Sequence, residues 1–430
     1  MYGCSYLGGT AVHVATTVPP ALRAIFAGAT DLDKFAFVRK GGITAQFNTR
    51  PDEPLSDDLM SLPVDEDRDG SLLRAAVAEH AGNTPMAPLW YGMPFRDSVS
   101  ELTGNRYWEE VGPYTYVEDL KSADIATYFW SNWQDEPTAQ VIQWAENLDS
   151  RLLLGPGTHC VTPPDFDFAG EVKAFFDEHL RDIAPAQPQP RVKWWLDDAA
   201  TDQHWHYGDV WPGVSASRQS WYLASDLTED LPEALHLQTR TARASRPEFS
   251  VDYSVASDEY FAFWIDSQHG HGLSFTSDAL AADHELIGYS IVHLPVSSDQ
   301  PEPILFAYLE QLAPDGTVSV LAFGRLGAAY RQIGEAPYDV LGLPWHTGSS
   351  ADYAPLQSDA EVLLSFALTP TAKLIPAGHR LRLVVTGADP RQRNLESIRR
   401  DPAPRISLML GGSSGARIDL PLQRRSFSRE

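Results

Sequence analysis

The chain has 430 residues, 43% of them hydrophobic, which is enough apolar material for two or three domains with a sizeable core. Its net charge of −25 argues against nucleic acid and anionic membrane surfaces as partners, because both would repel it. No apolar run approaches the roughly 18 residues of a membrane-spanning helix. The acidic side chains are spread along the whole chain, which indicates a solvated surface rather than a specific acidic site.

The first motif in the chain is Gly3-Cys4-Ser5-Tyr6-Leu7-Gly8. A serine flanked by glycines at this spacing fits a tight strand-to-helix turn, where the neighbouring residues must lack bulky side chains. Residues 10–17 then predict a helix, ended by Pro19-Pro20. A turn of this kind needs a strand and a sheet before it, yet only Met1 and Tyr2 precede Gly3. We therefore expect a chain that begins in the middle of its own catalytic domain.

The next part of the chain predicts an α/β domain with an insertion. The expected elements are strands at 22–27, 125–130 and 151–154 and helices at 138–147 and 170–180. Residues 51–122 are richer in Pro, Asp and Glu and contain a helical stretch at 71–80. Such a segment between strands suits a cap over an active site. We assign 1–50 and 123–185 to the α/β domain and 51–122 to a helical cap.

After the proline-rich linker at 185–190 the pattern changes to short β-rich runs separated by turn signals. These runs lie at 192–196, 304–309, 318–323, 361–368 and 380–385, and Pro314-Asp315-Gly316 forms a strong turn between two of them. No long periodic helix is visible there. We assign 191–425 to an all-β sandwich of jelly-roll type.

Three residues follow one another in the chain order Ser, Asp, His. A serine hydroxyl is a weak nucleophile until a histidine takes its proton, and a carboxylate must orient that histidine. Asp135 follows the predicted strand that ends at Trp130, and His159 follows the one that ends at Leu154. This order and placement predict Ser5 as nucleophile, His159 as base and then acid, and Asp135 as the orienting carboxylate. Glu136 and Asp149 are the alternatives to Asp135.

At these residues the chain resembles the CocE/NonD hydrolases, which include cocaine esterase, X-Pro dipeptidyl-peptidases and α-amino-acid ester hydrolases. The family motif Gly-x-Ser-Tyr-x-Gly is matched by Gly3, Ser5, Tyr6 and Gly8. The motif Gly-Trp-x-Asp is matched by Trp133 and Asp135, with Asn132 in place of glycine. The motif Gly-Pro-Trp-x-His is matched by Gly155, Pro156 and His159, with Gly157 in place of tryptophan. Residues 273–280, 314–316 and 378–382 resemble the family's C-terminal jelly roll, so the resemblance covers essentially the whole chain.

The resemblance also implies an oxyanion hole. In the family one donor is a tyrosine on an early loop, and this chain has no counterpart of that loop. The backbone N–H of Tyr6, the residue after the nucleophile, is the donor we expect here. Loss of one such donor costs roughly 2.7–4 kcal/mol of transition-state stabilisation. Trp108 and Trp133 are expected to line the acyl pocket, although core packing is an alternative for the aromatic residues here.

The two cysteines, Cys4 and Cys160, exclude a disulfide-dense scaffold and a cysteine-based zinc cluster. Each is adjacent to a residue expected to be catalytic, so the two are expected to be near neighbours. Of the two interpretations we favour a pair of reduced cysteines in the core. His204 and His206 have a spacing that suits a metal, but no third ligand is evident, and we expect them to pack at the surface.

The sequence thus predicts hydrolysis of a small ester or amide through an acyl-serine intermediate, with no metal or organic cofactor. An X-Pro dipeptidyl-peptidase is the first alternative, but it needs an acidic clamp for a free amino terminus. Asp65 and Asp67 are a candidate pair for that clamp, but we favour an exposed loop at these positions. The second alternative is a catalytically dead remnant whose jelly roll acts as a binding or assembly module. We expect a cytoplasmic protein, its true N-terminus and any signal peptide absent, and homo-oligomer formation stays open.

Overall fold

The structure is a computed structural model of the whole chain. It describes residues 1–44, 55–84, 86–200, 202–225, 235–240, 243–255, 264–391, 399–412 and 414–425. The expected boundary between residues 50 and 51 lies outside these ranges. Within the ranges just given, no helix is both long enough and apolar enough to cross a membrane.

The first part of the chain is built on a six-stranded sheet in the order β1-β2-β3-β4-β5-β6. The strands from β1 to β5 run parallel, and β6 is antiparallel to β5. The strands are β1 (Tyr2–Cys4), β2 (Ala24–Gly28), β3 (Ala126–Asn132), β4 (Arg151–Gly155), β5 (Val192–Trp195) and β6 (Trp205–Gly208). Parallel strands place their carboxyl ends at one edge of the sheet, where ligands of such folds bind.

Helices cover both faces of this sheet. They are α1 (Tyr6–Thr16) and α8 (Thr138–Leu148) on one face and α9 (Phe168–Arg181) on the other. The apolar stripe of α1, with Ala11 and Val12, packs with alternate strand residues such as Phe129 in one core cluster. The strand residues that point the opposite way pack with Phe175 of α9 in a second cluster. The sheet is therefore buried on both sides, as its continuous apolar runs predict.

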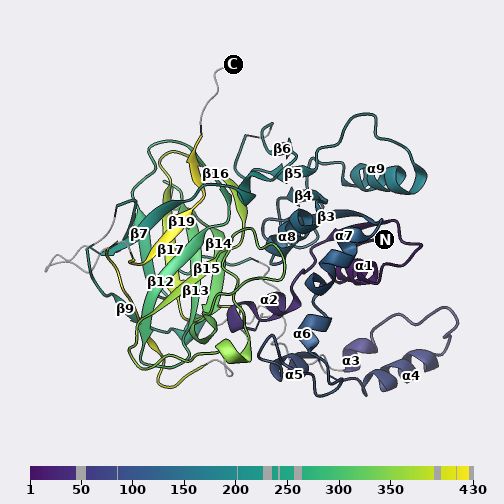
Figure 1. Cartoon of the computed structure of the whole chain (residues 1–430), viewed down its shortest axis with the longest axis horizontal. Coiled ribbons are helices and arrows are strands. Elements are labelled where there is room, and N and C mark those ends of the chain that lie inside the picture. Colours follow the sequence, from purple (N-terminus) through teal and green to yellow (C-terminus); the bar gives the residue numbers. More distant parts are fainter. Residues whose placement is uncertain are drawn as a thin grey trace.

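The segment between β2 and β3 is largely helical. Its elements are α2 (Lys34–Val38), η1 (Lys40–Gly42), α3 (Leu55–Asp58), α4 (Ser71–His80), α5 (Met86–Tyr91), α6 (Tyr107–Glu110), η3 (Pro113–Tyr116) and α7 (Val117–Ser122). Figure 1 shows α3, α4, α5 and α6 grouped below the α/β domain, and α7 beside α1. A small core of its own, which includes Phe35, Met93 and Trp108, stabilises the beginning and the middle of this insertion.

The second part of the chain is a β-sandwich, seen at the left of Figure 1. An eleven-stranded sheet has the order β14-β13-β17-β10-β8-β7-β19-β12-β18-β9, with β15 paired to β12, and a three-stranded sheet has the order β16-β11-β20. The strands are β7 (Gln219–Ser225), β8 (Leu235–Gln238), β9 (Glu248–Ser250), β10 (Leu273–Ser277), β11 (His284–Gly288), β12 (Ile291–Ser298), β13 (Ile304–Leu312), β14 (Val318–Gly327), β15 (Val362–Ala367), β16 (Thr371–Ile375), β17 (Arg380–Thr386), β18 (Arg405–Leu408), β19 (Arg417–Leu420) and β20 (Leu422–Arg424). Short 3-10 turns are η4 (Pro212–Val214), η5 (Tyr253–Val255), η6 (Ala328–Tyr330) and η7 (Ser350–Asp352). The prediction of an α/β domain followed by a β-sandwich is confirmed.

One strand belongs to a different sheet from the one expected. The run at 192–196 was assigned to the sandwich, but β5 pairs with β4 in the parallel sheet, Leu152 opposite Val192. The next strand, β6, then closes the same sheet. A short apolar run after a proline-rich linker has the same pattern whichever sheet it joins, because periodicity reports burial and not the pairing partner. The run at 192–196 therefore belongs to the parallel sheet and not to the sandwich.

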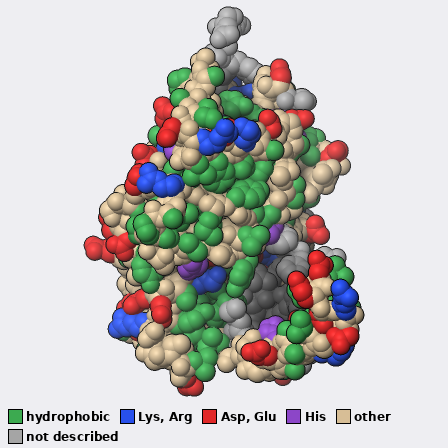
Figure 2. Space-filling model, turned by 90° about the vertical axis from the view of Figure 1, so that its right-hand side faces the viewer, with side chains coloured by type: hydrophobic (Ala, Val, Ile, Leu, Met, Phe, Trp, Pro, Cys, Tyr) green, Lys and Arg blue, Asp and Glu red, His purple; other side chains and the backbone are tan. Residues whose placement is uncertain are grey.

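Buried polar contacts join both the insertion and the α/β domain to the sandwich. Arg96 donates from Nη1 to both carboxylate oxygens of Asp33, 2.8 Å away, and from Nε to the carbonyl of Thr347 in the second domain. The Asn147 amide donates to the carbonyl of Asp339, and its oxygen accepts from the Asp339 N–H. Figure 2 shows a face of the molecule on which hydrophobic side chains gather in a broad central patch with charged groups around it.

Candidate active site

Ser5 occupies the turn between β1 and α1 in a strained backbone conformation, with φ of 60° and ψ of −128°. Such positive φ values are uncommon for residues other than glycine and are found at nucleophile elbows. The two flanking glycines are there for space. A Cβ on Gly3 would collide with the backbone of Leu7, and one on Gly8 would collide with the carbonyl of Gly28. The sequence motif therefore predicts this turn correctly.

Asp135 and His159 lie together beyond the carboxyl ends of β3 and β4. Nδ1 of His159 is 2.9 Å from one carboxylate oxygen of Asp135 and 3.0 Å from the other. An ionised carboxylate can only accept, so Nδ1 carries the hydrogen and donates it. The other ring nitrogen, Nε2, is then the basic one in the neutral imidazole. Asp135 is 1% exposed, which keeps water from competing for this bond.

The two groups change each other's protonation. Burial alone lowers the pKa of His159, but the hydrogen bond and the negative charge of Asp135 more than offset it, so the net pKa is raised above its ordinary value. Burial also raises the pKa of Asp135, against the opposing hydrogen bond from His159. Asp135 thus stabilises the imidazolium form of His159, which is the form that a general base has after it accepts a proton.

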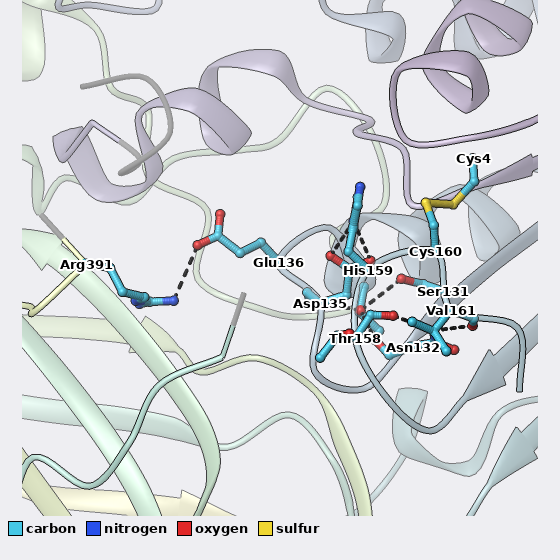
Figure 3. A network of polar contacts seen from close by, with 11 residues as sticks. Cys4, Ser131, Asn132, Asp135, Glu136, Thr158, His159, Cys160, Val161 and Arg391 are labelled. Atoms are coloured by element: carbon cyan, nitrogen blue, oxygen red, sulfur yellow. Dashed lines mark hydrogen bonds and ion pairs between the residues drawn. A yellow bond between two sulfur atoms is a disulfide. The ribbon is translucent and has the colours of Figure 1, made fainter. Parts of the chain in front are cut away.

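A disulfide joins the two stretches that carry Ser5 and His159. Cys4 precedes Ser5, Cys160 follows His159, and the two are bonded with their Cα atoms 6.0 Å apart (Figure 3). The expectation of two reduced cysteines is wrong, whereas their expected proximity is confirmed. The adjacency of each cysteine to a motif residue was the available signal, but sequence cannot tell a contact from a bond. The bridge fixes the backbone of the serine turn against that of the histidine loop.

The side chain of Asn132 holds the histidine loop, the segment around His159 that follows β4. Its side-chain amide donates to the carbonyl of Thr158 at 2.6 Å and to the carbonyl of Val161 at 2.8 Å, on either side of His159 (Figure 3). Gln134 adds a third contact, because its carbonyl oxygen accepts from the N–H of Gly157. In the sequence, Asn132 is apparent only as a departure from a glycine motif. Its role depends on two backbone carbonyls brought near by folding, for which the sequence holds no signal.

The two alternatives to Asp135 lie elsewhere. Glu136 forms an ion pair with Arg391 of the sandwich, 3.4 Å away, and points away from His159 (Figure 3). Asp149 caps the far end of α8 and contacts Arg191 from an exposed position. Neither is placed to orient His159. Tyr6 occupies the first position of α1, where the helix offers no carbonyl to its N–H.

The two tryptophans expected in the acyl pocket are core residues. Trp108 is 0% exposed and donates to the carbonyl of Met93, and Trp133 is 2% exposed and donates to the carbonyl of Trp195. Large aromatic side chains bury so much area that core packing favours such positions. The expected role of Trp108 and Trp133 in the acyl pocket stays a prediction.

Two further groups singled out in the sequence have structural positions. Asp67 is buried and accepts from the N–H groups of Leu72 and Leu73 in the first turn of α4, while Asp65 is exposed. These carboxylates do not form a clamp. His204 stacks on Trp195 at 3.9 Å between ring centres, and His206 stacks on Trp194. Within the described ranges no three His, Cys, Asp or Glu side chains gather as metal ligands.

Comparison with known families matches both parts of the chain. Residues 1–161 match the X-Pro dipeptidyl-peptidase (S15 family), and residues 185–395 match the X-Pro dipeptidyl-peptidase C-terminal non-catalytic domain. Two curated proteins, from Mycobacterium bovis and Mycobacterium tuberculosis, carry names that include the words serine esterase. Each is 28% identical over 411 residues, which is 84% of this chain. The chain spans 63% of the length of each of these relatives.

Solved structures share the whole fold. A CocE/NonD family hydrolase from Staphylococcus aureus superposes with a TM-score of 0.71 at 17% identity, covering 97% of this chain and 71% of that one. An α-amino acid ester hydrolase gives a TM-score of 0.67 at 16% identity, covering 98% of this chain and 76% of that one. The two domain matches give the chain an S15-type domain followed by the C-terminal non-catalytic domain of the X-Pro dipeptidyl-peptidases, and its fold is that of the CocE/NonD hydrolase from Staphylococcus aureus.

Proposed function

We propose that the protein is a serine hydrolase that cleaves an ester or amide of a small acyl substrate through an acyl-serine intermediate. The observation that carries the proposal is the hydrogen bond from Nδ1 of His159 to buried Asp135. The strained Ser5 turn, fixed to the same loop through the Cys4–Cys160 disulfide, supplies the nucleophile. The families matched and the names of the relatives agree with this chemistry.

In this mechanism Ser5 attacks the acyl carbon while Nε2 of His159 takes the hydroxyl proton. Asp135 holds the ring in that tautomer and stabilises the imidazolium formed. The oxyanion of the tetrahedral intermediate accepts a hydrogen bond from the Tyr6 N–H at the start of α1, where the helix dipole also favours negative charge. His159 then returns the proton to the leaving group, and a water molecule repeats the sequence to release the acid.

A dipeptidyl-peptidase is the second candidate, because the matched families carry that description. It requires an anionic group that binds a substrate's free amino terminus. Asp67, the candidate for that role in the sequence, already accepts two backbone hydrogen bonds in α4. We therefore favour esters and amides without a free amino terminus.

Two chromogenic substrates separate these candidates. The 430-residue chain should hydrolyse p-nitrophenyl butyrate faster, relative to the uncatalysed rate, than Ala-Pro-p-nitroanilide. Ser5→Ala should abolish both activities, and Ser122→Ala, a change at an exposed helix end, should leave them intact. Preference for the dipeptide substrate would favour the peptidase. Ester hydrolysis that survives Ser5→Ala would refute the proposed nucleophile.

A further inference from the structure

A cavity of about 150 Å³ lies between the two domains. Its walls come from α2 and η1 at the start of the insertion, from the residues around the first turn of α8, and from β14 and the loop 338–348 of the sandwich. One water molecule needs roughly 10–15 Å³ of such space, so the cavity can admit a larger polar group.

The charge of this cavity is opposite to that of the protein. Four cations line it, Arg39, Lys40, Arg96 and Arg325, against one carboxylate, Glu136. Arg96 is neutralised by Asp33 behind it. Glu136 is shared with Arg391, which already pairs with Asp389 at 2.9 Å. In a chain of net charge −25, positive charge is therefore concentrated at one internal site.

Arg325 and Lys40 form no ion pair within the described part of the chain, although the charge of Glu136 acts on both. Arg325 is 7% exposed, and its Nε has no hydrogen-bond partner among those residues. Lys40 is half-buried. Two buried cations differ in this respect, since Lys193 pairs with Glu171 and Arg382 with Glu310, each at 2.6 Å. A buried charge without an ion pair is costly, which makes Arg325 exceptional.

The fold holds these two cations close together. The turn η1 packs so tightly on β14 that a Cβ at Gly41 would clash with the Arg325 carbonyl. Burial, and next the charge of Arg325, lower the pKa of Lys40 to about 8. The Nε of Arg39, which also lacks a partner among the described residues, adds a second unsatisfied guanidinium donor to that of Arg325. The site thus has an excess of hydrogen-bond donors and of positive charge.

We propose that this cavity binds a small oxyanion, a carboxylate or phosphate group, between Lys40 and the guanidinium of Arg325. A planar guanidinium suits two oxygens of one anion, and a lysine ammonium adds a point charge. The oxyanion is either a free ion or the acid end of an acyl substrate. Glu136 both lines the cavity and follows Asp135 in the chain, so the site and the His159–Asp135 pair lie on two sides of one loop (Figure 3).

The test is calorimetric titration of the 430-residue chain with succinate and with inorganic phosphate at constant ionic strength. We expect saturable binding that weakens about tenfold or more in Lys40→Met and in Arg325→Met, because each loses a charge-assisted contact. Lys193→Met, the same change at a paired lysine, should leave anion affinity unchanged. Without anion, Lys40→Met should melt no lower than the parent chain, whereas Lys193→Met should melt lower.

A second measurement needs no variant. Succinate affinity should fall as the pH rises from 7 to 9.5, because Lys40, with its pKa lowered to about 8, loses its charge over that range. The charged groups that face Lys40 are Arg325, Glu136 and Arg391. Absence of saturable binding, or an affinity in Lys40→Met and Arg325→Met equal to that of the parent chain, would overturn the proposal.

Substrate kinetics separate the two sources of the oxyanion. If the site takes the acid end of a substrate, monomethyl succinate should have a lower KM than methyl butyrate, and Lys40→Met should remove that difference alone. If it takes a free ion, succinate should bind with no such difference in KM. Binding is measured without turnover, so a chain that binds succinate but hydrolyses no ester would refute the catalytic proposal and leave this one standing.

Discussion

At the residue scale, the proposed chemistry depends on which nitrogen of His159 carries a proton. Asp135 accepts from Nδ1 and leaves Nε2 basic, and it does so from a buried position. Burial lowers the pKa of His159, and the hydrogen bond and charge of Asp135 raise it by a larger amount. Removing the carboxylate should therefore change both the rate and its pH dependence.

The change Asp135→Asn tests this balance. Attack by Ser5 needs neutral His159, so in the parent chain the rate of ester hydrolysis should rise with pH through an inflection above 6.5, the ordinary pKa of histidine. In Asp135→Asn the inflection should move below 6.5, since burial then dominates. The plateau rate should fall by roughly 10³–10⁴-fold, because the amide can favour the wrong tautomer. An unchanged inflection would show that Asp135 does not act on His159.

At the element scale, one covalent bond joins the serine turn to the histidine loop, and side-chain hydrogen bonds from Asn132 and Gln134 hold that loop. The disulfide connects β1 to the loop after β4 across 156 residues of sequence. Asn132, at the end of β3, bonds the same loop from the other side. Both act on backbone position, so their loss should slow the reaction without removing a reacting group.

The double change Cys4→Ser, Cys160→Ser should lower the free energy of unfolding by about 2–4 kcal/mol, as loss of a disulfide across a long loop does. It should also slow ester hydrolysis, because Ser5 and His159 then move independently. Reduction of the parent chain should have the same effect and be reversed on reoxidation. Equal rates for the oxidised and reduced parent chain would contradict a positioning role.

The change Asn132→Gly restores the family's residue and removes two hydrogen bonds to the histidine loop. We expect a loss of about 1–3 kcal/mol in unfolding free energy, together with a lower kcat. Asn105→Ala, at an exposed position, is the control and should change neither quantity. A kcat equal to that of the parent would mean that Asn132 does not position the loop.

Much of this arrangement was predictable because local rules determine it. The glycines around Ser5, and the strands before Asp135 and His159, are patterns of steric need and burial, and both appear in sequence. The partners of Asn132, the sheet that β5 joins and the burial of Trp108 and Trp133 depend on contacts between distant segments. Hydrophobic periodicity is the same for either outcome at those positions. The disulfide is intermediate: the proximity of Cys4 and Cys160 was predictable from their adjacency to Ser5 and His159, but the bond between them was not.

At the scale of the whole molecule, the insertion, the α/β domain and the sandwich meet around buried polar groups. Arg96 is the centre of one such junction, because it bonds Asp33 and the Thr347 carbonyl and stacks on Phe35 and Trp345. Asp33 in turn accepts from the hydroxyl of Tyr338 in the sandwich. A change at Arg96 therefore removes contacts of Asp33 and of Thr347 at the same time, on both sides of the junction.

Removing this junction should destabilise the molecule as a unit. Arg96→Met leaves Asp33 as a buried unpaired carboxylate, which costs about 3–5 kcal/mol. Arg106→Met, whose ion pair with Glu109 is exposed, should cost less than about 1 kcal/mol. Urea unfolding monitored by tryptophan fluorescence measures both. Similar small losses for the two variants would show that the domains do not depend on Arg96.

The central claim is that Ser5 is a nucleophile activated by His159 and Asp135. The most direct measurement is fluorophosphonate labelling of the 430-residue chain, followed by peptide mapping, with heat-denatured chain as the control. The account predicts one label, on Ser5, in folded protein only, and its loss in His159→Ala. Label on another serine, or label on Ser5 that persists after denaturation or in His159→Ala, would contradict it.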